Sequence, residues 1–183
     1  MAYLSHDVIC SNKIQFVPQA TLYLFGVLTS ALHMAWMRQV CGRLESRFSY
    51  SNSLVYNNFP WPEARTEQRE RVEAQARAVL AAREPHLPPR GLATLADLYD
   101  PLAMPPELLK AHTELDRAVE KCYRPEPFHS DRERVEFLFS LYEKLTAPLL
   151  PVTPKPKGRR SQTAATTPRR TRQRTPALPG QSQ

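Results

Sequence analysis

Residues Thr21 to Pro62 read TLYLFGVLTSALHMAWMRQVCGRLESRFSYSNSLVYNNFPWP. This stretch joins an apolar helical pattern to a compact segment rich in Arg, Tyr and Asn, and it ends in alternating aromatic residues and prolines. From Ala20 to about Leu44, apolar residues recur at spacings near four, which predicts one long helix. Because its apolar surface is wider than one stripe, we expect this helix to be buried on more than one side.

The polar half of this stretch carries the residue types that contact DNA. Arg can bond guanine edges or phosphates, Asn can make two hydrogen bonds to adenine, and Tyr can stack on bases. A Tyr- and Asn-rich turn that only satisfies its own backbone has the same composition, so residue chemistry leaves both interpretations open. The candidate DNA-contact residues are Arg43, Arg47, Tyr50, Asn52, Tyr56, Asn57 and Asn58.

The N-terminal stretch from Asp7 to Val17, DVICSNKIQFV, is rich in β-branched and aromatic residues around a polar break. This pattern predicts two short strands joined by a turn. A strand at the start of a chain needs a partner, which is either a later segment or an upstream one. In the second case Met1 is an internal start within a longer protein.

Three further helices are predicted after Pro62. Glu63 to Arg83 has the mixed Glu and Arg charges of a solvated helix with a narrow apolar face, and a proline-rich loop follows it. Thr94 is positioned to cap a short helical turn. The spacing of Leu108, His112, Leu115, Val119 and Cys122 predicts one face of a helix that begins at Pro105.

The last predicted helix begins after Ser130, because the sequence SDRE from Ser130 to Glu133 has the spacing of a capping box. It ends near Pro148, and we expect it to form an antiparallel pair with the helix before it. Residues 149–183 are rich in Pro, Thr and Arg and low in apolar residues, which predicts a disordered tail.

The positive charge of the chain is concentrated in that tail. The formal charge is +7, with 25 Lys and Arg against 18 Asp and Glu. Residues 151–183 hold eight of the basic residues and no acidic one, so residues 1–150 carry 17 basic against 18 acidic residues. The basic character therefore belongs to the tail and by itself says little about the folded part.

No pattern of catalysis, cofactor binding or metal binding is present. The sequence contains no GxGxxG, GxxxxGK[ST] or HExxH motif, and its three cysteines form no CxxC pair. Widely spaced cysteines and the absence of a signal sequence favour a cytoplasmic protein with free thiols. The uncharged run from Ala20 to Met37 is just long enough for a membrane span, but its polar residues favour a buried helix and no membrane contact.

The run LYLFGVLTSALHMAWMRQVCGRLESRFSYSNSLVYNNFPWP resembles the end of the target-recognition domain of MmeI-like type IIG/IIL restriction-modification enzymes. LDRAVEKCYR, from Leu115 to Arg124, and RVEFLFSLYEKL, from Arg134 to Leu145, are similar to the helical C-terminal domain of that family. The resemblance covers most of residues 1–148. It implies double-stranded DNA as a partner.

The resemblance also implies what a whole enzyme of this family contains. Its class I methyltransferase domain moves a methyl group from S-adenosylmethionine to N6 of adenine, and its endonuclease domain cleaves DNA with Mg²⁺. This sequence holds neither the Gly-rich cofactor loop nor the Asn-Pro-Pro-aromatic motif of the methyltransferase. We therefore expect a C-terminal fragment, from a truncated or split gene, that binds no cofactor and is inactive alone.

The expected fold is mostly α with a short β segment near the N-terminus. Residues 1–62 are expected to be the end of a truncated α+β target-recognition domain, residues 63–148 a helical C-terminal domain, and residues 149–183 the tail. Two alternatives to DNA recognition remain open. The chain is either a helical docking module for a separately encoded methyltransferase subunit, or a nonspecific nucleic-acid binder that acts through its basic tail.

Overall fold

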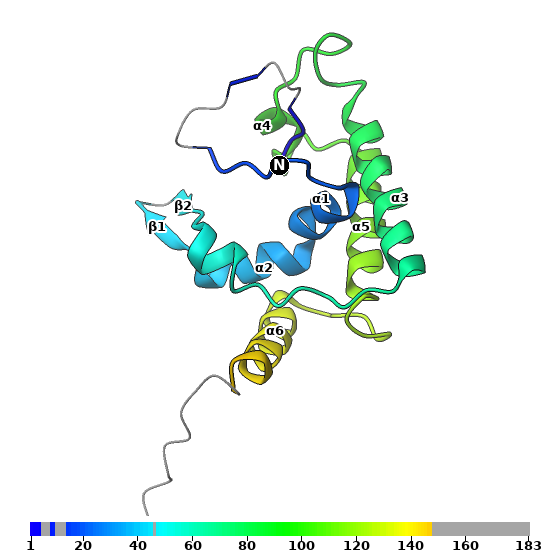
Figure 1. Ribbon diagram of the computed structural model, residues 1–183. Helices are drawn as coiled ribbons and strands as arrows, with labels where there is room; N and C mark the ends of the chain where they lie inside the picture. The colour runs from blue at the N-terminus through cyan, green and yellow to red at the C-terminus, as the bar shows by residue number, and fades with distance from the viewer. Residues whose placement is uncertain (5–7, 10–13, 46, 148–183) are drawn as a thin grey trace, which may run out of the picture. The chain divides into compact units, whose positions relative to one another are not determined.

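The computed structural model describes residues 1–4, 8–9, 14–45 and 47–147. Within these residues the chain is mostly helical and carries one two-stranded sheet, which confirms the expected fold class (Figure 1). The predicted disordered tail and the turn between the two predicted N-terminal strands lie outside the described residues. Residues 8–9 and 14–17, which are described, do not lie in strands.

The predicted long helix is in fact two helices, α1 (Leu22–Thr29) and α2 (Ala31–Val40), so the expectation of one helix is wrong. Ser30 separates them because its backbone is extended, with φ −68° and ψ 158°. The Ser30 hydroxyl accepts a hydrogen bond from the backbone N–H of His33, and Asp116 accepts one from Ala31 N at 2.7 Å. These two acceptors satisfy N–H groups that a continuous helix would have bonded internally.

The short β segment lies later in the chain than predicted. Strands β1 (Gly42–Leu44) and β2 (Arg47–Ser49) pair antiparallel, with Arg43 opposite Phe48. Glu45, in the turn between them, has a φ of 58°. A local hairpin needs only a short loop to close, whereas residues 14–17 have no strand partner in the described part of the chain.

The connection from this hairpin to the next helix contains one helical turn and a largely buried run of aromatic residues and prolines. A single π-helical turn, η1 (Asn52–Tyr56), follows the hairpin. The chain then runs extended through Phe59-Pro60-Trp61-Pro62, of which Phe59, Pro60 and Pro62 are buried. Tyr123 donates a hydrogen bond from its hydroxyl to Pro60 O at 2.9 Å.

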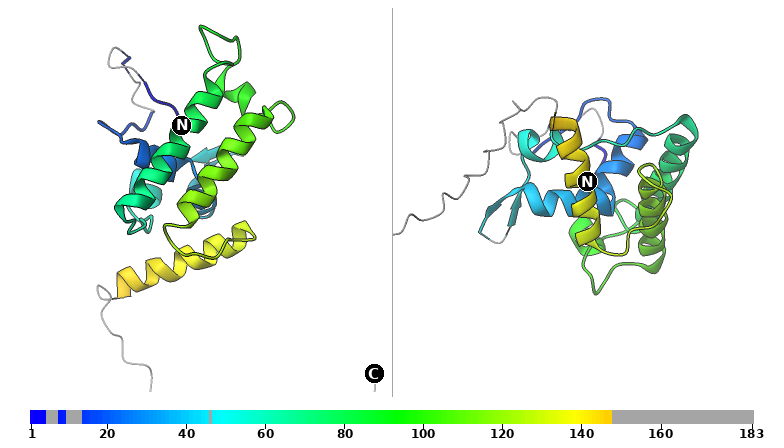
Figure 2. Two further views of the ribbon diagram at one scale, coloured as in Figure 1. Left: turned by 90° about the vertical axis from the view of Figure 1, so that its right-hand side faces the viewer. Right: turned by 90° about the horizontal axis from the view of Figure 1, so that it is seen from below.

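Helices α3 (Thr66–Arg83) and α5 (Pro106–Glu120) pack against each other, and α1 lies against both (Figures 1 and 2). Both helices were predicted, as was the short α4 (Leu95–Leu98) that Thr94 caps. The buried residues at the α3–α5 contact are aliphatic: Val72, Ala76, Val79, Leu108, Leu115 and Val119. On the predicted α5 face, His112 is only half-buried and Cys122 lies beyond the end of the helix.

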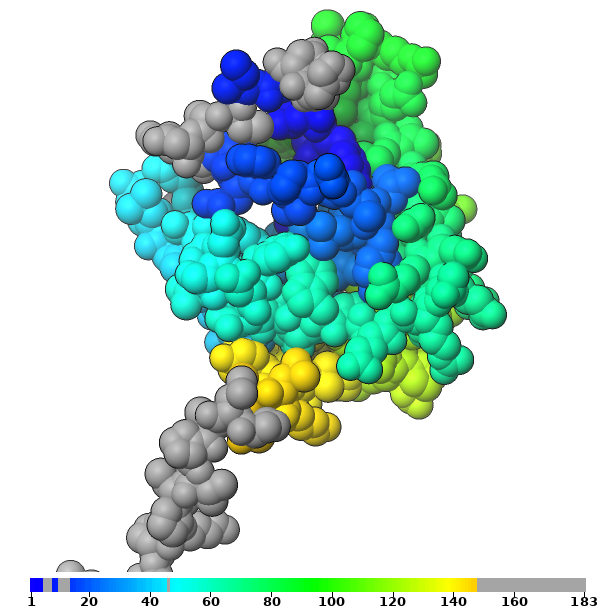
Figure 3. All heavy atoms as spheres, in the orientation of Figure 1, coloured from blue at the N-terminus to red at the C-terminus, as the bar shows by residue number. Residues whose placement is uncertain are grey.

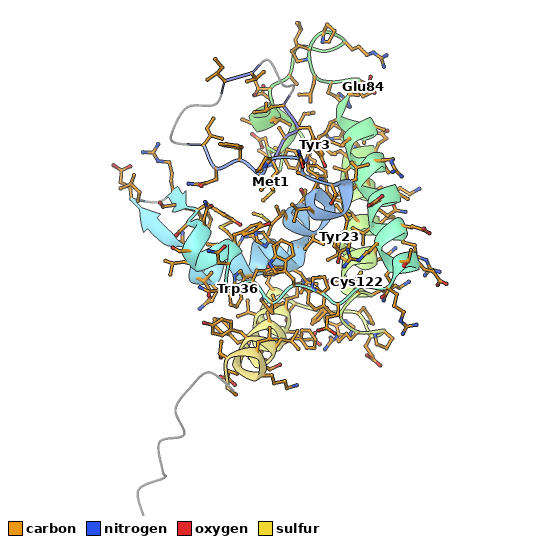
Figure 4. All side chains as sticks on the ribbon, in the orientation of Figure 1. Met1, Tyr3, Tyr23, Trp36, Glu84 and Cys122 are labelled. Atoms are coloured by element: carbon orange, nitrogen blue, oxygen red, sulfur yellow. The ribbon has the colours of Figure 1, made fainter. Side chains whose placement is uncertain are left out.

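The last helix, α6 (Asp131–Thr146), begins after Ser130 as predicted, and the Ser130 hydroxyl accepts a hydrogen bond from Glu133 N. However, α6 packs mainly against α2, so the expected antiparallel pair with α5 is wrong. The reason is aromatic contact: the rings of Phe139 and Tyr142 lie 5.1 and 5.9 Å from that of Trp36. Figure 4 shows Trp36 on the side of α2 that faces α6.

Candidate nucleic-acid interface

The β1–β2 hairpin extends from the C-terminal end of α2 and is exposed along both strands (Figure 1). The guanidinium of Arg43 lies 4.2 Å from the ring centroid of Phe48, its partner across the sheet. This cation–π contact restrains an otherwise long and flexible cation at the surface. Arg43 is therefore held in place and remains accessible to a ligand.

The turn of the hairpin carries an exposed ion pair between Glu45 and Arg47. Their side chains are 77% and 76% exposed, and Arg47 Nη2 lies 3.3 Å from Glu45 Oε2. An exposed pair of this kind contributes little to stability. Glu45 and Arg47 can therefore each leave the pair and bind another partner. Sequence analysis missed Glu45, although an acidic residue between Arg43 and Arg47 was visible.

Tyr50, directly after β2, bonds to the interior. Its hydroxyl lies 3.1 Å from Nε2 of the buried His33. Burial raises the pKa of Tyr50 to about 12 and lowers the pKa of His33 to about 4, so both groups are neutral at pH 7. In this conformation the Tyr50 hydroxyl links the end of the hairpin to α2.

The η1 turn is fixed from two sides. Trp36 donates a hydrogen bond from Nε1 to Val55 O at 3.0 Å, deep in the core. Asn58 donates from Nδ2 to the carbonyl oxygens of Ser53 and Leu54 at 2.8 and 3.3 Å. The Asn58 amide therefore satisfies the backbone of its own turn.

The remaining candidates divide in the same way. The half-buried ring of Tyr56 packs edge-on against Trp61 with centroids 5.1 Å apart. Asn52, at the start of η1, and Asn57, directly after η1, are exposed. The structure thus places Arg43, Arg47, Asn52 and Asn57 on one exposed stretch, while Tyr50, Tyr56 and Asn58 hold that stretch in place. In Figure 3 this stretch (cyan) forms a continuous part of the surface.

The candidate interface is a surface and not a pocket. Two cavities of about 460 and 260 Å³ are lined by residues of α3, of α4, of the loops beside α3 and α5, and of the N-terminus, and by none of the seven candidates. In the described ranges no three His, Cys, Asp or Glu side chains come close enough together to hold a metal ion. Nor is any helix there both long and apolar enough to cross a bilayer.

Comparison with known proteins assigns both halves of the folded part to one family. The family model described as "MmeI, target recognition domain" matches residues 1–63, and the one described as "MmeI, C-terminal domain" matches residues 64–150. The DNA methyltransferase A of Bacillus subtilis (strain 168) is 42% identical over 146 residues, which is 80% of this chain and 16% of that protein.

A solved structure agrees with these sequence matches. The chain resembles the type IIL restriction-modification enzyme MmeI, solved in complex with DNA, with a TM-score of 0.66 and 47% identity over 71% of this chain and 17% of that one. The chain thus spans about a sixth of the length of the relatives it matches. It belongs to the MmeI family, in which it corresponds to the target recognition domain followed by the C-terminal domain.

Proposed function

We propose that the chain is the DNA-recognition end of a site-specific DNA adenine-N6 methyltransferase of a restriction-modification system. The observation that carries this proposal is the exposed stretch from β1 to η1, which lies within the match to a target recognition domain. The similar Bacillus subtilis protein is named a DNA methyltransferase, and the similar enzyme MmeI was solved in complex with DNA. We place the domain boundary at residues 62 and 63.

The geometry suggests how this surface would meet a duplex. A two-stranded β-ribbon fits the major groove, where Arg bonds guanine, an acidic side chain accepts from cytosine N4, and Asn bonds adenine. Arg43 shares one face of the ribbon with Phe48, and Arg47 shares the other face with Leu44, so only one of the two arginines would face the bases. Asn52 would follow from η1, and Asn57 from the position directly after it. Recognition by such a domain holds the duplex while the target adenine is flipped into a methyltransferase pocket.

The methyl donor does not fit these residues. The sequence holds no Gly-rich cofactor loop and no Asn-Pro-Pro-aromatic motif, and the two described cavities are lined mainly by residues of α3, of the loops beside α3 and α5, and of the N-terminus. We infer that S-adenosylmethionine, and Mg²⁺ for cleavage, are bound by a part of the enzyme outside these residues. The 183 residues alone would then be inactive, and their place of action is the cytoplasm.

A docking role is the second candidate function, and exposed apolar side chains favour it. Phe16 is 71% exposed and Leu44 is 66% exposed. Exposed apolar surface of this kind marks contact with a partner, which here would be a separately encoded methyltransferase portion. A neighbouring reading frame that encodes the missing catalytic motifs, and whose product co-purifies with this chain, would support that role.

The proposal is tested by selection of DNA from a pool of randomised 30-base-pair duplexes, with the full chain as bait. We expect one sequence motif to be enriched, and we expect Asn52→Ala to relax that motif at one position by about 1–3 kcal/mol of discrimination. Arg77→Ala on α3, an exposed arginine paired with Glu73, is the matched control and should leave the motif unchanged.

The same assay separates recognition from nonspecific binding. In a second chain, the eight Lys and Arg residues of 151–183 are replaced by Gln. If the folded part recognises DNA, this chain still enriches the same motif with lower affinity. If binding disappears and no motif was ever enriched, the tail alone attaches to nucleic acid and the proposal fails.

A further inference from the structure

Two side chains of α2 reach the stretch that carries the candidate DNA contacts. His33 and Trp36 are three residues apart and therefore lie on the same face of the helix. His33 Nε2 is bonded to the Tyr50 hydroxyl at 3.1 Å, and Trp36 Nε1 donates to Val55 O at 3.0 Å. One face of α2 thus makes a polar contact at the base of the hairpin and a second in η1.

These two contacts are buried and rigidly packed. His33 is 0% exposed and Trp36 is 1% exposed. The ring of Phe59 packs edge-on against both, with centroids 4.7 Å from His33 and 6.3 Å from Trp36. A buried polar group that loses its partner costs more than an exposed one, so each bond favours one orientation of the segment.

The His33 ring has a single hydrogen bond in the described part of the chain. Its Nδ1 is buried without a partner. A bare nitrogen lone pair is less costly to bury than an unpaired N–H, which favours the tautomer with the proton on Nε2. In that tautomer His33 donates to the Tyr50 oxygen, and the bond has a defined direction.

The hairpin needs such an anchor because it is small. Each strand pairs only three residues, and both strands are exposed. A two-stranded ribbon of this size is marginal in water without further packing. Tyr50 follows β2 directly. The bond of its hydroxyl therefore restrains the chain at the base of the hairpin, where a small backbone rotation would move both strands.

We propose that His33 is a positioning residue which, through Tyr50, sets the orientation of the β1–β2 hairpin relative to η1. The pair thereby sets the spacing between the hairpin side chains and the asparagines Asn52 and Asn57 that would read DNA. The effect on the orientation of the hairpin follows from the His33–Tyr50 and Trp36–Val55 hydrogen bonds. The effect on DNA recognition rests on the proposed function.

The first test is amide hydrogen exchange on the full chain carrying Tyr50→Phe, which removes one hydroxyl and keeps the ring. We expect exchange to become about 5- to 10-fold faster in β1, β2 and residues 50–55, as for the loss of one hydrogen bond, with α3 and α5 unchanged. The matched control is Tyr56→Phe, which removes a hydroxyl from the same segment and should change none of these rates.

Two further readouts separate positioning from general destabilisation. The ¹⁵N signals of the His33 ring should shift in Tyr50→Phe and not in Tyr56→Phe. His33→Leu combined with Tyr50→Phe should accelerate hairpin exchange no more than Tyr50→Phe alone, because both remove the same bond. If Tyr50→Phe behaves like the control, or speeds exchange equally in α3 and α5, the inference is overturned.

The DNA test uses the duplex selection described above. Tyr50→Phe should retain at least half of the affinity for bulk DNA but broaden the enriched motif at two or more positions. An unchanged motif would overturn the DNA consequence. If the unmodified chain enriches no motif, the proposed function fails, whereas the exchange and ¹⁵N results still decide whether His33 positions the hairpin.

Discussion

Asp116 joins α5 to the first turn of α2 through its carboxyl group. It accepts the backbone N–H of Ala31 at 2.7 Å. Burial raises its pKa to about 6 despite that hydrogen bond, with the charges of Glu120 and Asp131 raising it further and that of Arg134 lowering it. The carboxyl is therefore more easily protonated in the folded chain than in the unfolded chain.

The Asp116 carboxyl should contribute to the pH dependence of the free energy of unfolding. Because the folded pKa is raised from 3.8 to about 6, Asp116 favours folding below pH 4, and this contribution is lost as pH rises to 6. Asp116→Asn should remove about 2 kcal/mol of that pH dependence, since one pKa unit corresponds to about 1.4 kcal/mol. The measurement is urea unfolding of both proteins at pH 4 and pH 7.

The informative quantity is the difference in the free energy of unfolding between the unmodified chain and Asp116→Asn, because other groups titrate in the same pH range. Burial lowers the pKa of His33 and of His112 to about 4, so each makes folding more favourable as pH rises from 4 to 6.5. Glu107→Gln, an exposed change on α5, is the control. An Asp116→Asn difference that is the same at both pH values would contradict the prediction.

Gly26 sets how closely α1 approaches α3. A Cβ at Gly26 would lie 2.7 Å from Val72 Cγ1 and 3.3 Å from Leu115 Cδ1, whereas a Cβ at Gly42 would meet nothing within 4 Å. Gly26→Ala should therefore destabilise the chain by about 1–3 kcal/mol through overpacking. Gly42→Ala should be near neutral. Chemical denaturation compares the two, and equal effects would show that α1 and α3 can separate without cost.

At the scale of elements, the helices that were predicted correctly are those with local signals. Thr94 and Ser130 cap α4 and α6, and the apolar rows of α3 and α5 follow the helical period. The break between α1 and α2 escaped prediction because one of its caps, Asp116, is 85 residues away from Ala31. Such a contact has no signature in a local pattern.

The hairpin and the candidate site show the same limit. The sequence between β1 and β2 has no Asn-Gly or Asp-Gly pair of the kind that marks a short hairpin. The prediction therefore assigned Gly42–Leu44 to the preceding helix and Arg47–Ser49 to the polar segment. The sequence indicated a stretch for DNA contact that the structure places largely at the surface. It could not separate the exposed Asn52 from Asn58, whose amide bonds its own turn, because that difference depends on folded geometry.

The cap of α2 can be tested directly. In Ser30→Ala, the N–H of His33 loses its acceptor, and the Ser30 hydroxyl no longer bonds Val27 O at 2.7 Å. We expect a loss of about 1 kcal/mol, typical of an N-cap. Exchange of α2 amides should accelerate more than that of α3 amides. Ser140→Ala, which removes a hydroxyl within α6, is the comparison, and equal acceleration of α2 in both variants would exclude a special role for Ser30.

At the scale of the whole molecule, the two family matches form one compact unit over Met1–Leu150. Helix α2 contacts the recognition segment through His33 and Trp36, and it packs against α6 of the C-terminal domain (Figure 2). Arg38 of α2 bonds Asp131 at the start of α6 at 2.9 Å. The C-terminal domain therefore supports the surface that we propose for DNA recognition without lying on it.

The ion pair between Arg134 of α6 and Glu120 of α5 should be central to that support. Arg134 Nε and Nη2 donate to Glu120 Oε1 at 2.9 and 2.6 Å, and the two side chains are only 16% and 7% exposed. Arg134→Gln leaves the Glu120 carboxylate buried without its cation, which should cost about 3 kcal/mol. Denaturation midpoints of the full chain measure this loss.

The paired variant Arg134→Met with Glu120→Met distinguishes a buried charge from lost packing. Removing both charges removes the unpaired carboxylate, so the double variant should recover most of the stability that Arg134→Gln loses. Arg132→Gln, which breaks the exposed pair with Glu136 on the same helix, should leave the denaturation midpoint almost unchanged. If the double variant is as unstable as Arg134→Gln, then α6 is held by the packing around these side chains, and the aromatic contacts to Trp36 become the main support of α2.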